Sequence, residues 1–151
     1  MDNILSDEYF MKAALREAEE AFSKDEVPVG AVVVCNNRII ARAHNLTETL
    51  TDPTAHAEMQ VITAATSYLG GKYLTDCTVY ITLEPCPMCA GALYWCQADR
   101  IVYGASDDKQ GYTINSSESL HPKTVVKPGV MENECSALLK EFFASKRRNR
   151  N

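Results

Sequence analysis

Two short segments contain the side chains best suited to chemistry. One places His56 two positions before Glu58, and the other places Cys86 three positions before Cys89. Two thiols at this spacing, at the junction of a strand and a helix, can both point at one metal ion, and the free amides of the first helical turn stabilise thiolates. We interpret these residues as a metal site with a carboxylate beside it.

The number of ligands decides what kind of metal site this is. A structural zinc ion has four protein ligands, whereas a catalytic one has three and a water molecule. Cys96 lies two helical turns, roughly 10 Å, beyond Cys89, and Cys35, Cys77 and Cys135 fall in strands or on a distant helix. Spacing leaves His44 and His121 open as further candidates. The smallest set predicts one catalytic Zn²⁺ per subunit with three protein ligands: His56, Cys86 and Cys89.

Glu58 acquires a role in such an open site. Placed beside the zinc without binding it, its carboxylate can take a proton from zinc-bound water and pass it to a substrate. Two thiolates and a neutral imidazole leave the site without net charge, and the ion lowers the pKa of its water toward neutrality. The predicted reaction is attack on a carbon that carries an amino group, followed by loss of ammonia.

Each half of this pattern has a simpler explanation. His56 and Glu58 alone suit a helix start, where a glutamate offsets the dipole, and the two thiols alone suit a redox pair. A redox pair leaves His56 and Glu58 without a role, and a zinc-stabilised module without activity has no use for the carboxylate. The two halves together match the signature of zinc-dependent nucleobase deaminases.

Length and composition indicate an ordinary globular protein. The 151 residues suit a single domain over 1–151, with 46% hydrophobic and 23% charged residues. A chain of this length can bury a core without disulfide bonds, so we expect its six cysteines to be reduced. An acidic, polar N-terminus and the lack of a run of about 20 apolar residues predict a cytoplasmic protein without membrane contact. We expect no organic cofactor.

The net charge of −5 argues against a broadly basic surface. The charge is uneven, because residues 146–151 hold four cations and no anion. This basic tail is either a solvated helix end or a segment that contacts phosphates.

Periodicity and punctuation predict alternating strands and helices. Helices are expected over 6–24, 55–69, 87–97 and 132–148, and strands over 31–35, 38–41, 77–83, 100–103 and 123–127. Ser6 and Thr54 are expected to cap the first two helices, and Pro87 suits the first turn of the third. Residues 44–54 and 105–122 are expected to be loops. The last helix is expected to direct four side chains inward: Leu138, Leu139, Phe142 and Phe143. The order indicates an α/β domain that opens with a hairpin, with helices on both faces of the sheet.

The chain resembles the cytidine/deoxycytidylate deaminase superfamily, and within it the bacterial tRNA-specific adenosine deaminases. The matching segments are 26–31, Asn45, 52–58, 83–92, Asp107, Lys109, Gly111 and 134–143. The resemblance implies a single-domain, three-layer α/β/α fold with a central mixed sheet of about five strands. It also implies a homodimer.

The resemblance assigns further residues to the substrate. Asn45 would hydrogen-bond the target base, Val29 would pack against it, and Asp107 would contact the nucleotide. Phe142 and Phe143, with the basic tail, would shape an RNA groove. The simpler explanations are a turn residue for Asn45 and a core stripe for the two phenylalanines.

Two substrates follow from the resemblance. The first is the wobble adenosine of a tRNA anticodon loop, which would be converted to inosine. The alternative is a free base or nucleoside, guanine above all, because bacterial guanine deaminases share the segment 52–58. The chain departs from the family pattern at 111–115 and is shortened at 121–124, where the family builds its RNA-facing side.

Overall fold

A computed structural model of the chain describes residues 5–149. Its five strands form one sheet in the order β2-β1-β3-β4-β5. β1 pairs antiparallel with β2 and β3, whereas β3, β4 and β5 run parallel. The strands are β1 (Gly30–Cys35), β2 (Arg38–His44), β3 (Cys77–Leu83), β4 (Arg100–Ala105) and β5 (Val125–Lys127). The predicted mixed sheet of five strands is confirmed.

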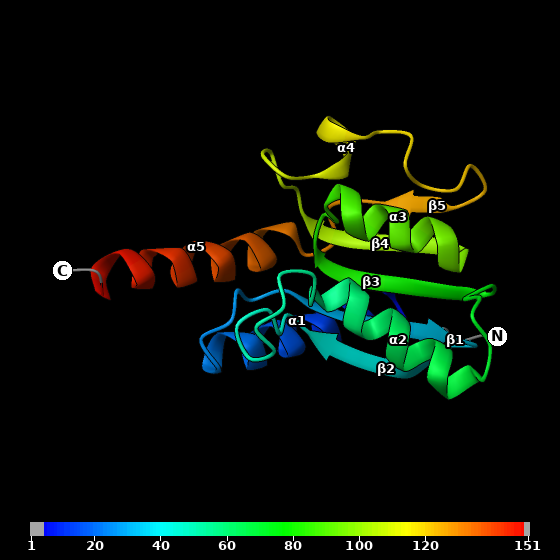
Figure 1. Cartoon of the computed structure of the whole chain (residues 1–151), viewed down its shortest axis with the longest axis horizontal. Helices are drawn as coiled ribbons and strands as arrows, with labels where there is room; N and C mark the ends of the chain where they lie inside the picture. The colour runs from blue at the N-terminus through cyan, green and yellow to red at the C-terminus, as the bar shows by residue number, and fades with distance from the viewer. Residues whose placement is uncertain (1–4, 150–151) are drawn as a thin grey trace.

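The helices cover both faces of this sheet (Figure 1). They are α1 (Asp7–Ser23), α2 (Ala57–Leu69), α3 (Pro87–Cys96), α4 (Tyr112–Asn115) and α5 (Glu132–Asn149). Successive strand residues point to opposite faces, so Val33 and Val79 pack in the core under α2 and α3, while Val32 and Val34 pack in the core under α1. This arrangement confirms the three-layer α/β/α fold. Among the described residues, no helix has the length and hydrophobicity needed to cross a membrane.

Most of the predicted helix and turn signals act as expected. Ser6 Oγ accepts a hydrogen bond from the Tyr9 N–H at 3.1 Å, and α2 ends at Gly70 with a φ of 72°. Pro87 is the first residue of α3. Thr54 does not cap α2, because its N–H and hydroxyl both donate to Asp52 Oδ1, at 2.9 and 2.8 Å. α2 begins two residues later than that cap would place it.

Two features differ from the sequence-based expectations. The loop expected over 105–122 contains the short helix α4. Cys35 and Cys77, expected to be reduced, form a disulfide. They are direct partners in the antiparallel pairing of β1 and β3, with Cα atoms 4.5 Å apart. That separation brings opposed side chains into contact, and neither sulfur belongs to the candidate metal site.

Candidate active site

Two helix N-termini meet beyond the carboxyl end of β3. His56 is the residue that precedes α2, and Cys86 is the residue that precedes α3; both have extended backbone conformations. Cys89 lies in the first turn of α3, where Pro87 starts the helix without leaving an N–H unpaired. The loops that precede α2 and α3 therefore bring the candidate ligands together.

The three candidate ligand atoms form one compact group. His56 Nδ1 is 3.6 Å from Cys86 Sγ and 3.4 Å from Cys89 Sγ. All three lie within 4.8 Å of one another, and no other such group occurs within residues 5–149. His44 instead pairs with Glu17 at 3.0 Å, and His121 packs against the Tyr94 ring.

The charge state of the sulfurs favours a cation. Hydrogen bonds from Cys89 and His56 lower the pKa of Cys86 to about 4. The same Cys86 thiolate and burial raise the pKa of Cys89. A cation between the two sulfurs would supply the positive charge that lets both ionise, and two thiolates with an imidazole are a donor set that suits Zn²⁺. The residues present fit a zinc ion.

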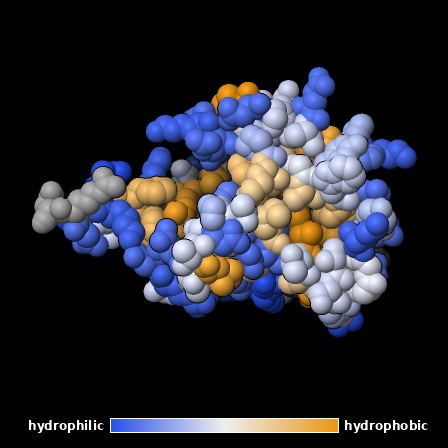
Figure 2. Space-filling model, in the orientation of Figure 1, coloured by the Kyte–Doolittle hydropathy of each residue, from blue (hydrophilic) through white to orange (hydrophobic). Residues whose placement is uncertain are grey.

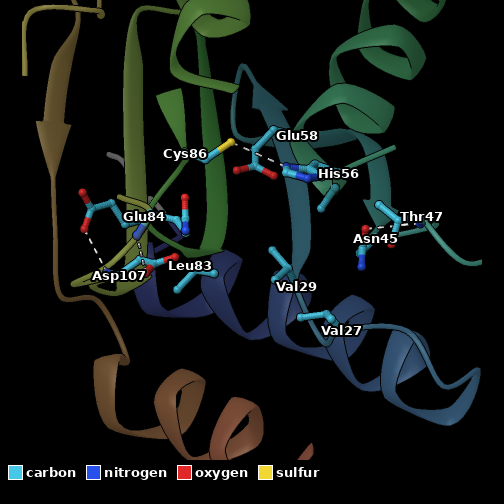
Figure 3. A pocket seen from close by; sticks show the side chains of 12 residues that line it. Val27, Val29, Asn45, Thr47, His56, Glu58, Leu83, Glu84, Cys86 and Asp107 are labelled. Atoms are coloured by element: carbon cyan, nitrogen blue, oxygen red, sulfur yellow. Dashed lines mark hydrogen bonds between the residues drawn. The ribbon is translucent and has the colours of Figure 1, made fainter. Parts of the chain in front are cut away.

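Glu58 lies within the first turn of α2 and is 4% exposed. Burial raises the pKa of its carboxyl to about 7. Figure 3 shows this carboxylate beside the line that joins Cys86 to His56. The group therefore lies next to the ligands and can hold or release a proton near neutral pH.

A cavity of about 250 Å³ opens beside these residues. Three of the residues assigned to the substrate by resemblance line it: Val29, Asn45 and Asp107. Sequence reasoning missed six further lining residues: Val27, Thr47, Ala57, Leu83, Glu84 and Gln110. Those residues flank the recognised motifs, and proximity along the chain is the signal that could have found them.

The loop that carries Asn45 is held by a buried carboxylate. Glu26 is fully buried and accepts hydrogen bonds from the N–H groups of Glu48 at 3.0 Å and Thr49 at 2.6 Å. Burial alone would raise the pKa of Glu26, but the hydrogen bonds from the Thr49 and Glu48 segment lower it below its ordinary value of 4.5. Asn45 Oδ1 in turn accepts from the Thr47 N–H at 3.4 Å.

Phe142 and Phe143 lie outside this cavity. They line a separate groove of about 730 Å³ between the end of α1, the loop after β2 and α5. Val27 lines both the groove and the cavity, so the two adjoin. The expected inward packing of both rings is wrong for Phe143, which is 45% exposed, whereas Phe142 is buried against Phe22. Consecutive helical residues point about 100° apart, so Phe142 is covered by α1 while Phe143 reaches toward solvent.

The basic tail continues α5 as far as Asn149. Lys146 lines the groove and pairs with Asp25 at 2.6 Å. Figure 1 shows the C-terminal half of α5 projecting away from the sheet. Residues 150 and 151 of the predicted tail lie outside the described part of the chain.

The fold and the site together define a zinc-dependent deaminase. Residues 5–105 match the cytidine and deoxycytidylate deaminase zinc-binding region, and the chain belongs to that family. Within it, the chain is 46% identical over 149 residues to the tRNA-specific adenosine deaminase of Bacillus subtilis, covering 95% of this chain and 92% of the relative. The chain belongs to the family of tRNA-specific adenosine deaminases, and it is an enzyme of hydrolytic deamination.

Two solved structures bear on the substrate. One, from a study of A-to-I editing by tRNA:A34 deaminases at the wobble position of transfer RNA, is 43% identical with a TM-score of 0.81, covering 87% of this chain and 99% of its own. The other is a guanine deaminase from Bacillus subtilis, 41% identical with a TM-score of 0.65, covering 68% of this chain and 66% of its own.

Proposed function

We propose that this protein converts the wobble adenosine of a tRNA anticodon loop to inosine. The observation that carries the proposal is the junction, at Val27, of the cavity beside Glu58 with the groove along α5. The cavity has room for a base but not for folded RNA, and enzymes of this class act on a base taken out of its stack. The similarity to tRNA-specific adenosine deaminases over nearly the whole chain supports the same substrate.

The four residues of the two motifs divide the chemistry. His56, Cys86 and Cys89 would hold one zinc ion per subunit. When bound, the ion lowers the pKa of a coordinated water toward neutrality. Glu58 would take one proton from that water and pass it to the ring nitrogen. It would then take the remaining proton from the hydroxyl on the attacked carbon and give it to the amine, so that the C–N bond breaks, a carbonyl forms and ammonia leaves. Its raised pKa of about 7 suits both directions of transfer.

The cavity walls would place the base for this transfer. Asn45 supplies amide groups for the base, Val29 an apolar surface and Asp107 a contact to the nucleotide. Asp107 Oδ1 already accepts from the N–H groups of Lys109 and Gln110, at 3.1 and 3.0 Å, so its orientation is set before substrate arrives.

The groove would receive the neighbouring nucleotides. Phe143 presents an exposed ring on which a base can stack, and Phe142 supports it from below. Lys146 lies close by as a cation for a phosphate. Figure 2 shows apolar side chains gathered where α5 leaves the body of the molecule. A tRNA substrate agrees with a cytoplasmic protein. It also agrees with a chain that forms one deaminase domain over residues 1–151.

A homodimer is part of the proposal. On α3, Met88, Tyr94 and Trp95 are 37%, 38% and 76% exposed. Figure 2 shows an apolar area over α2 and α3, on the face turned to the viewer. Exposed apolar groups gathered in this way mark interaction surfaces, and a second copy of the chain is the partner that we assign to them.

A parallel assay tests the substrate. The zinc-loaded protein is incubated separately with a tRNA anticodon stem-loop, guanine, adenosine, cytosine and cytidine, and products are identified by mass spectrometry. Inosine in the RNA, with the free compounds unchanged, supports the proposal. Xanthine from guanine with unchanged RNA would replace it with the alternative that the guanine deaminase neighbour suggests.

A further inference from the structure

Glu84 is a buried carboxylate to which the chemistry above gives no proton to move. It lies between the end of β3 and Cys86 and is 4% exposed. Both of its oxygens accept hydrogen bonds from a segment further along the chain. Oε1 accepts from the Asp107 N–H at 3.0 Å, and Oε2 accepts from the Thr113 N–H at 3.0 Å and the Thr113 hydroxyl at 2.6 Å. One side chain therefore fastens both ends of the segment 107–113.

The backbone of this segment is shaped to reach the carboxylate. A Cβ added to Gly111 would overlap the Glu84 carboxylate and the Asp107 carbonyl oxygen, so glycine is required there for close approach rather than for its φ. Tyr112 also donates its N–H to the carbonyl of Pro85 at 2.9 Å, next to Cys86. The segment is thus attached directly to the residues that lead into α3.

The attached segment is a wall of the substrate cavity. Asp107 and Gln110 line the cavity together with Glu84 itself, and Figure 3 shows the hydrogen bond between Glu84 and Asp107 at its edge. Hydrogen bonds to an ionised carboxylate are stronger than neutral ones. Removing the acceptor leaves the part-buried N–H groups of Asp107 and Thr113 without this partner, and the wall would then move.

We propose that Glu84 is a positioning residue that fixes the segment 107–113 as a wall of the cavity and thereby sets the affinity for substrate. The proposal rests on the function proposed above only for the choice of substrate in its assay. A glutamate that merely stabilised the fold would lower the melting temperature without changing KM.

Three substitutions weaken the contact between Glu84 and the segment 107–113 in different ways. Glu84→Gln keeps the shape but offers one acceptor oxygen instead of two, Thr113→Val removes one donor, and Gly111→Ala forces the segment away. We expect each to raise KM for the anticodon stem-loop about tenfold, with kcat changed by less than about threefold. Thr113→Ser keeps the hydroxyl and should restore KM. Thr124→Val is the matched control, because Thr124 Oγ donates to the Ala98 carbonyl at 2.9 Å, outside the cavity lining.

Amide hydrogen exchange of segment 107–113 provides a readout that needs no substrate. Exchange at Asp107 and Thr113 should be faster in Glu84→Gln and Thr113→Val than in wild type or Thr124→Val, with the zinc content of all four equal. Unchanged exchange, or a loss of kcat at unchanged KM, would overturn the proposal. If wild type leaves the RNA unmodified, the proposed function fails while the exchange rates still decide the role of Glu84.

Discussion

Glu58 and Glu84 line the cavity, Glu26 holds the adjoining loop, and the surroundings of these three buried glutamates differ. Glu58 forms no salt bridge among the described residues. Burial raises the pKa of its carboxyl to about 7, although the nearby charge of His56 opposes that shift. Glu26 accepts backbone hydrogen bonds that lower its pKa despite burial. Glu84 accepts three hydrogen bonds from one segment. Hydrogen bonds to the charged form of a carboxylate stabilise it, so Glu58, unlike Glu26, is suited to exchange a proton at neutral pH.

Replacing one sulfur tests the metal ligands directly. We expect Cys86→Ala to reduce zinc content at least tenfold, because loss of one of three protein ligands weakens binding more than loss of an outer contact does. The melting temperature should fall with it. Atomic absorption and calorimetry measure the two effects.

Cys96→Ala is the matched control for that substitution. Cys96 is also a buried, free cysteine on α3, but it donates to the Leu93 carbonyl and lies outside the ligand group. Its zinc content should equal that of wild type. Equal zinc in Cys86→Ala would contradict the assignment.

At the scale of elements, Asp7 ties α1 to three strands. Its carboxylate accepts from Arg100 Nη1 and Nη2 at 2.8 and 2.6 Å, from the Tyr80 hydroxyl at 2.7 Å and from Lys127 Nζ at 3.0 Å. The hydrogen bond from Arg100 is the main cause that holds the pKa of Asp7 well below its usual 3.8. The start of α1 is therefore bound to β3, β4 and β5.

This ion cluster predicts a specific pH dependence of stability. A carboxyl whose pKa is lower in the folded state stabilises the fold fully above its unfolded pKa, and the contribution is lost as the pH falls below about 4. Asp7→Asn should lower the free energy of unfolding at pH 7 by about 2 kcal/mol, and the difference from wild type should shrink at pH 3. Urea titrations at both pH values measure it. An equal difference at both would contradict the role of this carboxylate.

How far the sequence predicts the elements depends on how local their signals are. Ser6, Gly70 and Pro87 act within one helical turn, and the structure confirms them. The cap assigned to Thr54 is wrong because Asp52 competes for its groups. The short helix α4 was missed because its first residue, Tyr112, is held by the Pro85 carbonyl rather than by a capping side chain of its own.

The same contrast applies to the site and to the disulfide. The two motifs predict His56, Glu58, Cys86 and Cys89 as site residues, because their residue types and spacing suit a metal site with a carboxylate beside it. The contact of Glu84 with segment 107–113 could not be predicted, since its partners lie more than twenty positions along the chain. The Cys35–Cys77 bond likewise depends on the register of β1 against β3, which no local pattern specifies.

At the scale of the whole molecule, the exposed face of α3 tests the proposed homodimer. Trp95→Glu places a charge on the large apolar side chain that is most exposed within residues 5–149, at 76%. Burying an unpaired charge in an interface is unfavourable. We expect wild type to sediment as a dimer and Trp95→Glu as a monomer with an unchanged circular dichroism spectrum. Tyr9→Glu is the matched control, because Tyr9 is 50% exposed on α1, which covers the other face of the sheet, and this variant should remain a dimer. Wild type that sediments as a monomer would refute the dimer.

In the proposed mechanism, three residues hold zinc while Glu58 moves the protons. The most direct measurement compares Glu58→Gln with wild type in one experiment, quantifying bound zinc and the inosine formed in an anticodon stem-loop. Loss of a general acid–base group slows reactions by about 10²–10⁴-fold. We therefore predict equal zinc in the two proteins and inosine formation slower by that factor in Glu58→Gln. Inosine formed at the wild-type rate, with zinc still bound, would contradict the claim.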